Sequence, residues 1–158
     1  MHKISIIGLG QIGASIGLGL RKKIKGVEIV GHDIEPTTAG KARKIGAVDK
    51  ISYSLPNSLE GASIVIVCVP VEAVKQVFDE IGPSLEEGTI VTDTSSTKIQ
   101  VMQWADVKGV CKWWEVQSAR TDSDGGLTHR LRKKTRVFLT VDAFGSPPRV
   151  RGTMAKSG

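Results

Sequence analysis

Short apolar runs alternate with amphipathic segments along the first 110 residues of this 158-residue chain. The runs are strand-sized and apolar on both faces, which is typical of buried parallel strands. The intervening segments carry apolar residues at helical spacing, most clearly over residues 71–81. Residues 49–57 are expected to form turns around a short apolar segment. The pattern predicts strands over residues 3–7, 27–31, 62–69 and 88–93, and helices over residues 14–23, 36–46, 71–81 and 98–106.

This order of strands and helices predicts right-handed βαβ units. We therefore expect an α/β fold with a doubly wound parallel sheet over residues 1–110. No apolar run is long enough for a membrane helix, so no membrane partner is expected. Cys68 and Cys111 provide neither a disulfide framework nor a metal-binding spacing, which predicts a reduced, cytoplasmic protein without a metal site.

The last third of the chain differs in composition from the rest. The net charge is +6, yet residues 1–110 contain equal numbers of basic and acidic side chains. The whole excess lies in residues 111–158, which also lack isoleucine. These residues are predicted to form a separate basic tail, with one strand over residues 136–141. The abrupt change resembles a shifted reading frame or a degenerate end.

A glycine motif, G-x-G-x-x-G, follows the first strand and opens the first helix. The first glycine permits a tight turn, the second lets a pyrophosphate approach the backbone, and the third allows close packing of helix and strand. The helix N-terminus supplies free N–H groups to the phosphates. A glycine turn that binds nothing is the alternative. In this context the motif predicts a Rossmann-like domain that binds a dinucleotide over residues 1–110. The residues expected to bind the cofactor are Gly8, Leu9, Gly10, Gln11, Ile12 and Gly13.

Asp33 stands at the end of the second strand, 20 residues beyond Gly13. A carboxylate at this place accepts hydrogen bonds from the ribose hydroxyls of an adenosine. It also repels a 2′-phosphate, and Ile34 and Glu35, rather than an arginine, follow it. NAD is therefore the expected cofactor and NADP the less favoured one. The alternative is a solvated strand end, and His32 is expected at the rim of the site.

Four motifs together resemble the prephenate/arogenate dehydrogenases of tyrosine biosynthesis, over about residues 3–110. The resemblance implies an NAD-dependent oxidoreductase that decarboxylates prephenate or arogenate oxidatively, passing a hydride to the nicotinamide. In the family a helical C-terminal domain completes the substrate site and the dimer. The resemblance thus allows a homodimer, although that domain is not found in this sequence. The motifs are residues 8–16, residues 31–33, Cys68-Val69-Pro70-Val71, and residues 92–98, where Asp93, Ser96 and Lys98 form D-x-x-S-x-K.

The resemblance also implies roles for individual residues. Val69 and Pro70 match the loop that lies against the cofactor, and Ser96 matches a serine near the nicotinamide and the substrate hydroxyl. Helix capping is the alternative for Ser96. The family histidine of a G-H-P motif, which polarises the substrate hydroxyl, has no match. His129 lacks the matching neighbours, so no residue is assigned as the base.

Two other functions remain open at this point. One is an NAD-binding module that is catalytically incomplete. The other is a polyanion or nucleic-acid binder, because basic groups neutralise phosphates and indoles stack on bases. A solvated basic segment accounts for the same residues, so no nucleic-acid partner is expected. The residues concerned are Trp113, Trp114, Arg130, Arg132, Lys133, Lys134 and Arg136.

Overall fold

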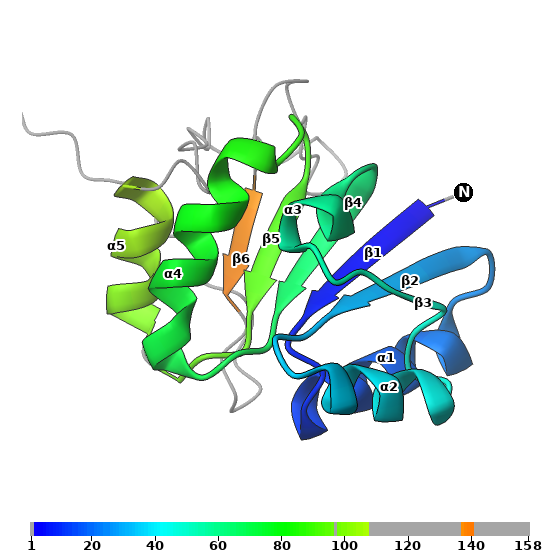
Figure 1. Ribbon diagram of the computed structural model, residues 1–158. Helices are drawn as coiled ribbons and strands as arrows, with labels where there is room; N and C mark the ends of the chain where they lie inside the picture. The colour runs from blue at the N-terminus through cyan, green and yellow to red at the C-terminus, as the bar shows by residue number, and fades with distance from the viewer. Residues whose placement is uncertain (1, 97, 108–136, 141–158) are drawn as a thin grey trace, which may run out of the picture.

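A single parallel sheet organises the protein (Figure 1). The computed structural model describes residues 2–96, 98–107 and 137–140. The strand order is β3-β2-β1-β4-β5-β6, and every neighbouring pair is parallel. The predicted doubly wound sheet is thereby confirmed. The strands are β1 (His2–Ile7), β2 (Val27–His32), β3 (Lys50–Ile51), β4 (Ala62–Val67), β5 (Ile90–Asp93) and β6 (Val137–Thr140).

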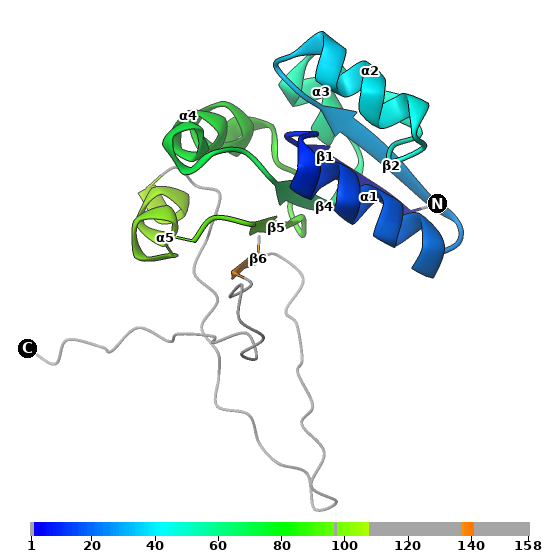
Figure 2. The same ribbon diagram turned by 90° about the horizontal axis from the view of Figure 1, so that it is seen from below.

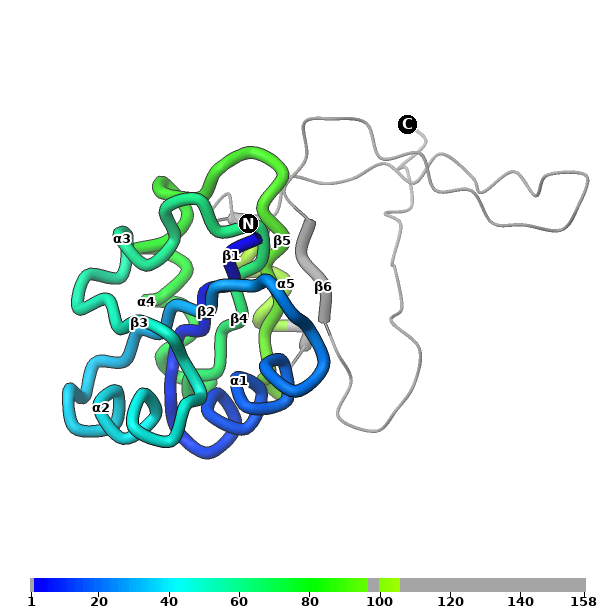
Figure 3. The backbone as a smooth tube through the Cα atoms, turned by 90° about the vertical axis from the view of Figure 1, so that its right-hand side faces the viewer, coloured from blue at the N-terminus to red at the C-terminus, as the bar shows by residue number. Residues whose placement is uncertain are grey.

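Helices cover the two faces of this sheet. Figure 2 shows α1 on one side of the sheet and α4 and α5 on the other. Helices α1 and α2 lie side by side (Figures 1 and 3). This arrangement follows from right-handed crossovers that run from β1 to β2 in one direction along the sheet and from β4 to β5 in the other. The helices are α1 (Gln11–Lys23), α2 (Pro36–Lys44), α3 (Leu55–Leu59), α4 (Val71–Ile81) and α5 (Lys98–Val107), with a 3₁₀ turn, η1, over Gly82–Ser84.

Each face of the sheet has its own apolar core. Successive side chains of a strand point to opposite faces, and β1 divides its residues accordingly. Ile4 and Ile6 pack with residues of α1 and α2, whereas Ile7 packs with residues of α3, α4 and α5. Because both faces are covered at β1, the strand is buried from Ile4 to Ile7. Burial on both faces of the sheet explains why the sequence of this strand is mostly apolar rather than alternating.

Three elements differ most from the prediction. Strand β3 lies in the segment that was expected to form turns around a short apolar stretch. Helix α3 lies in a segment expected to form turns, and its five residues are too few to show a helical period. It is held by burial of Leu55 and Leu59. Helix α1 begins at Gln11 rather than at residue 14, so Gly13 lies inside its first turn.

Strand β6 lies within the range where the sequence predicted a strand. It pairs with β5 from Ile90↔Val137 to Asp93↔Thr140. The indoles, the basic cluster and His129 lie outside the described residues, and the division of the chain after residue 110 stays a prediction. Within the described ranges, no helix is long and apolar enough to cross a membrane.

Candidate functional site

The candidate site lies at the carboxyl edge of the sheet, between β1 and β4. The chain leaves β1 toward one face and β4 toward the other, and ligands of such sheets bind at this reversal. Backbone hydrogen bonds hold the strand ends together here. Gly8 N–H donates to the carbonyl of His32 at 2.8 Å, and Cys68 N–H donates to the carbonyl of Ile7 at 2.7 Å. The ends of β1, β2 and β4 therefore form one continuous rim.

Two glycines of the loop are required by the protein's own backbone. Gly8 has a φ of +88°, and a Cβ there would lie 2.5 Å from the carbonyl oxygen of Cys68. A Cβ on Gly13 would overlap the carbonyl oxygen of Gly8. Both positions thus allow the close approach of strand, loop and helix that the sequence predicted.

Gly10 is different, because the protein itself does not need a glycine there. It is exposed and has an ordinary φ of −64°, and a Cβ would meet nothing within 4 Å. It is the N-cap of α1, and no side chain caps that helix. The amides of the first turn face outward along the helix axis. Open space at Gly10 thus coincides with a helix N-terminus that no side chain caps, and this combination suits a phosphate group.

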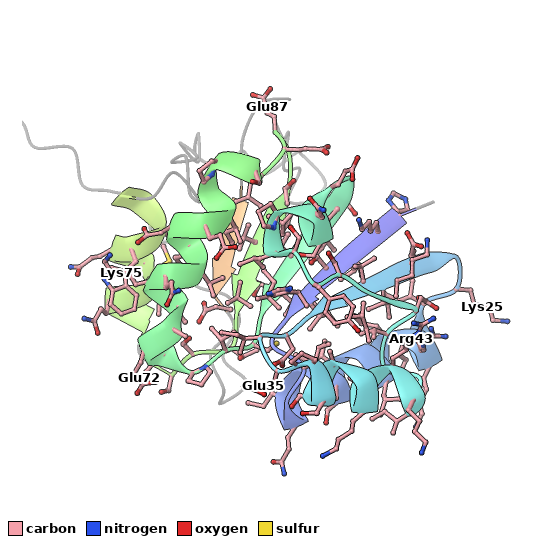
Figure 4. The ribbon with its side chains drawn as sticks, viewed as in Figure 1. Lys25, Glu35, Arg43, Glu72, Lys75 and Glu87 are labelled. Carbon is pink, nitrogen blue, oxygen red and sulfur yellow. The ribbon has the colours of Figure 1, made fainter. Side chains whose placement is uncertain are left out.

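Asp33 is joined to the glycine loop. Its Oδ2 accepts the N–H of Leu9 at 2.6 Å, and its Oδ1 accepts the N–H of Glu35 at 2.8 Å. The carboxylate is therefore oriented by two backbone N–H groups, one from the glycine loop and one from its own turn. Figure 4 shows Glu35 near the strand ends, whereas Arg43 lies at the far end of α2. The glycine loop and Asp33 are thus joined by a hydrogen bond and belong to one site.

Val69 and Pro70 flank the same loop from the end of β4. Val69 Cγ1 lies 3.0 Å from the position that a Cβ on Gly8 would take. Pro70 is exposed and caps α4. Next to them, burial raises the pKa of the Cys68 thiol to about 11, and the charge of Asp93 adds to this, while a hydrogen bond with Thr94 opposes it. A neutral thiol is a small apolar group, so Cys68 serves packing here.

The third motif follows β5. Asp93 is buried, and its Oδ1 accepts the N–H of Ser95 at 2.7 Å, which forms a tight turn. Ser96 comes next and is exposed. It stands at the same edge of the sheet as the glycine loop, but β4 lies between β5 and β1. The side chain of Lys98 lies outside the described part.

Neither histidine of the described residues has the position of a base beside Ser96. His2 begins β1 at the opposite edge of the sheet. His32 Nδ1 lies 2.9 Å from the carbonyl oxygen of Ser52, so this nitrogen carries the proton and donates it. The described residues also contain no group of three or more His, Cys, Asp or Glu side chains that could hold a metal ion.

The sequence reasoning missed the His32–Ser52 hydrogen bond and the loop it holds. The bond depends on the pairing of β2 with β3, where Gly31 is opposite Ile51. Strand β3 has only two residues, which is too few for an alternating pattern. No local signal could have revealed this contact.

Comparison with known proteins identifies relatives for this domain. The family model described as prephenate dehydrogenase, nucleotide-binding domain, matches residues 16–112. A prephenate dehydrogenase of Bacillus subtilis is 36% identical over 104 residues, which are 65% of this chain and 28% of the relative. For a prephenate dehydrogenase of Lactococcus lactis the identity is 36% over 107 residues, 67% of this chain and 30% of the relative. The chain thus spans less than a third of these relatives.

Solved structures of the same kind share the fold. Prephenate dehydrogenase of Aquifex aeolicus, in complex with hydroxyphenyl propionate and NAD+, has a TM-score of 0.64 and 25% identity. The match covers 69% of this chain and 38% of that one. Arogenate dehydrogenase of Synechocystis has a TM-score of 0.62 and 31% identity, covering 67% of this chain and 37% of that one.

Proposed function

Since this chain belongs to the prephenate dehydrogenase family through its nucleotide-binding domain, we propose that it binds NAD at the carboxyl edge of the sheet, in preference to NADP. The observation that carries the proposal is the hydrogen bond between Leu9 N and Asp33 Oδ2. It joins the two parts of a dinucleotide site, the glycine loop for the pyrophosphate and the acid for the adenosine ribose.

The residues present fit such a cofactor. Open space at Gly10 receives the pyrophosphate in front of the α1 amides, and Asp33 is fixed beside it. Val69 and Pro70 border the path toward β5, where Ser96 is exposed. A bound nicotinamide would supply the hydride acceptor. The roles of these residues toward the cofactor follow from this placement and form part of the proposal.

The preference for NAD rests on charge. A second phosphate on the adenosine ribose would meet the carboxylate of Asp33, and like charges brought together repel strongly. No cation is bonded to Asp33 in the described part of the chain. The two ion pairs nearest in sequence, Arg21–Asp49 and Lys50–Glu28, engage other carboxylates.

Replacing Asp33 with serine tests this preference. We expect Asp33→Ser to lower NAD affinity and to reduce the NAD-to-NADP affinity ratio about tenfold or more, because the repulsion disappears with the carboxylate. Calorimetric titration of both cofactors measures the ratio. Glu87→Ser is the matched control, since Glu87 is an exposed carboxylate at the opposite edge (Figure 4). Equal affinities of the wild-type chain for NAD and NADP would contradict the proposal.

We propose further that the whole protein oxidises prephenate or arogenate with loss of carbon dioxide. The family membership supports this reaction, and Ser96 is the residue of this chain that we assign to the substrate side. Purified protein is incubated with NAD and each substrate in turn, and NADH formation is followed by absorbance. NADH formed with one of the two substrates identifies that substrate. NAD binding without NADH formation would instead support a second candidate function, a module that binds NAD without turnover.

That second candidate is a nucleotide-binding module without turnover of its own. The position of His32 favours it, because its Nδ1–H is engaged with Ser52 rather than with the edge near Ser96. Such a module would still bind NAD through the glycine loop and Asp33. Calorimetry and the NADH assay on the same preparation separate the two candidates.

A further inference from the structure

Charges of opposite sign are separated between the two halves of the domain. Residues 1–59, which run from β1 through α3, contain nine basic and four acidic side chains. Residues 60–110, which run from β4 through α5, contain three basic and eight acidic ones. The two halves thus carry formal charges of +5 and −5. The absence of net charge in residues 1–110 therefore conceals a polarised distribution.

The cations of the first half gather where α1 and α2 end, at the amino edge of the sheet. The last turn of each of these helices contains three basic residues. The two ends are joined, because Arg21 pairs with Asp49, which follows α2. A Cβ on Gly17 of α1 would lie only 2.2 Å from the carbonyl oxygen of Ala47. We call this area the basic surface, and its exposed cations are Lys22, Lys23, Lys25, Lys41, Arg43 and Lys44.

The second half presents carboxylates at the same edge, beside the starts of β4 and β5. Glu86 Oε1 accepts the N–H of Gly61 at 3.0 Å, which joins the turns that precede these two strands. Figure 4 shows Glu87 well separated from Lys25 and Arg43. We call this area the acidic surface, and its exposed carboxylates are Glu60, Glu80, Glu86 and Glu87.

The helix dipole does not account for this separation. The dipole favours cations at the C-terminal end of a helix, and α1 and α2 follow that preference. Helix α4 ends at the same edge, yet its last turn contains Asp79 and Glu80 and no basic residue. Within the described ranges, the cations in ion pairs are those of Arg21, Lys50 and Lys75, none of which belongs to the basic surface.

We propose that the basic surface binds the acidic surface of a second copy of this chain. Because both surfaces lie at the amino edge, a twofold axis between them places each basic surface opposite its partner's acidic surface, and the contact closes with two copies. Complementary charge fixes the orientation of such a pair. Ile24 and Ile45, which are 43% and 57% exposed, lie among the cations and would be covered. The inference goes beyond the proposed function, whose site lies at the opposite edge and stays open.

Sedimentation equilibrium of the full chain tests the proposal through two charge-reversed variants. We expect the wild-type dissociation constant to rise about tenfold or more in high salt, because salt screens exposed charges. The first variant combines Lys23→Glu with Lys44→Glu, and the second combines Glu80→Lys with Glu87→Lys. Each variant alone should be monomeric, since like charges would then meet. An equimolar mixture of the two should dimerise, because both contacts of the mixed pair again join opposite charges.

A third variant is the matched control. Glu35→Lys with Glu72→Lys changes the net charge as much as the second variant does, but it lies at the carboxyl edge (Figure 4). Its dissociation constant should stay within about twofold of the wild type. Thermal melting confirms that all three variants are folded, and their exposed positions favour this.

Three results would overturn the proposal. The first is a wild-type chain that is monomeric in low salt as well as in high salt. The second is a first variant that dimerises like the wild type, which would show that the acidic surface attracts the basic residues 111–158 of another copy instead. The third is an equimolar mixture that stays monomeric although the wild type dimerises, because the two surfaces would then not face each other.

Discussion

At the scale of single residues, the three glycines of the loop are required for different reasons. Gly8 and Gly13 lie where a Cβ would meet backbone atoms of the protein, whereas Gly10 faces open space. Glycine therefore has a structural role at Gly8 and Gly13, whereas at Gly10 the role that we propose is ligand binding. Mutations at these positions should separate stability from binding.

We expect Gly10→Val to abolish NAD binding, because the side chain would fill the open space proposed for the pyrophosphate. The free energy of unfolding should fall by only about 1 kcal/mol, because valine is a poorer N-cap than glycine. Gly13→Ala should destabilise the fold by about 3 kcal/mol, because the added methyl group overlaps the carbonyl of Gly8. Calorimetry measures binding, and urea unfolding measures stability. Normal NAD binding by Gly10→Val would disprove the role assigned to the loop.

The buried thiol of Cys68 makes the stability of the protein depend on pH in the alkaline range. Burial raises the pKa of its thiol to about 11 in the folded state. As the pH rises, the thiol therefore ionises in the unfolded state before it ionises in the folded state. The stability that Cys68 contributes is complete below about pH 9 and is lost as the pH rises toward 11. In a Cys111→Ser background, urea unfolding at intervals across this range should show the decline, and Cys68→Ala should reduce it. A decline of equal size in both variants would contradict the assignment.

At the scale of elements, helix α4 shows how a period in the sequence becomes packing. Val74, Phe78 and Ile81 are buried on one side of the helix, and Lys75 is exposed on another. These positions follow the helical spacing in the sequence, which is why this helix was predicted with its exact bounds. The five residues of α3 had no such period, and their helical form depends on burial instead.

Two substitutions in α4 should differ sharply in their effect on stability. Phe78→Ala removes a fully buried ring and is expected to lower the free energy of unfolding by about 3–5 kcal/mol. Lys75→Ala removes an exposed pair with Asp79, 3.2 Å long, and is expected to lower it by less than about 0.5 kcal/mol. Urea unfolding compares the two. Similar effects of both would argue against the buried position of Phe78.

At the scale of the whole molecule, the site and the excess charge belong to different parts of the chain. Every residue that we assign to the cofactor lies before residue 100, and residues 1–110 carry no net charge. The net charge of +6 therefore comes from residues 111–158. These later residues also contribute β6, which pairs with β5 at the edge of the sheet.

Truncation after Gly109 should therefore leave NAD affinity within about twofold of the full chain and lower the melting temperature. The loss of β6 leaves β5 as an unpaired edge, which explains the expected destabilisation. Calorimetry and thermal melting are measured separately. A folded truncated chain without NAD affinity would refute the assignment of the site to residues 1–110, whereas an unfolded one would show that β6 is needed for the fold.

The sequence by itself determined the fold class, the glycine loop and the order of most elements, because these depend on residues close together in the chain. The spacing of Gly8, Gly10 and Gly13 and the apolar period of α4 are such local signals. Only the tertiary structure decided how Asp33 and His32 are held. The bond from Leu9 to Asp33 requires β1 to pair with β2, and the bond from His32 to Ser52 requires β2 to pair with β3. Periodicity reports which side of an element is buried, but pairing between distant segments is settled by packing of the whole sheet.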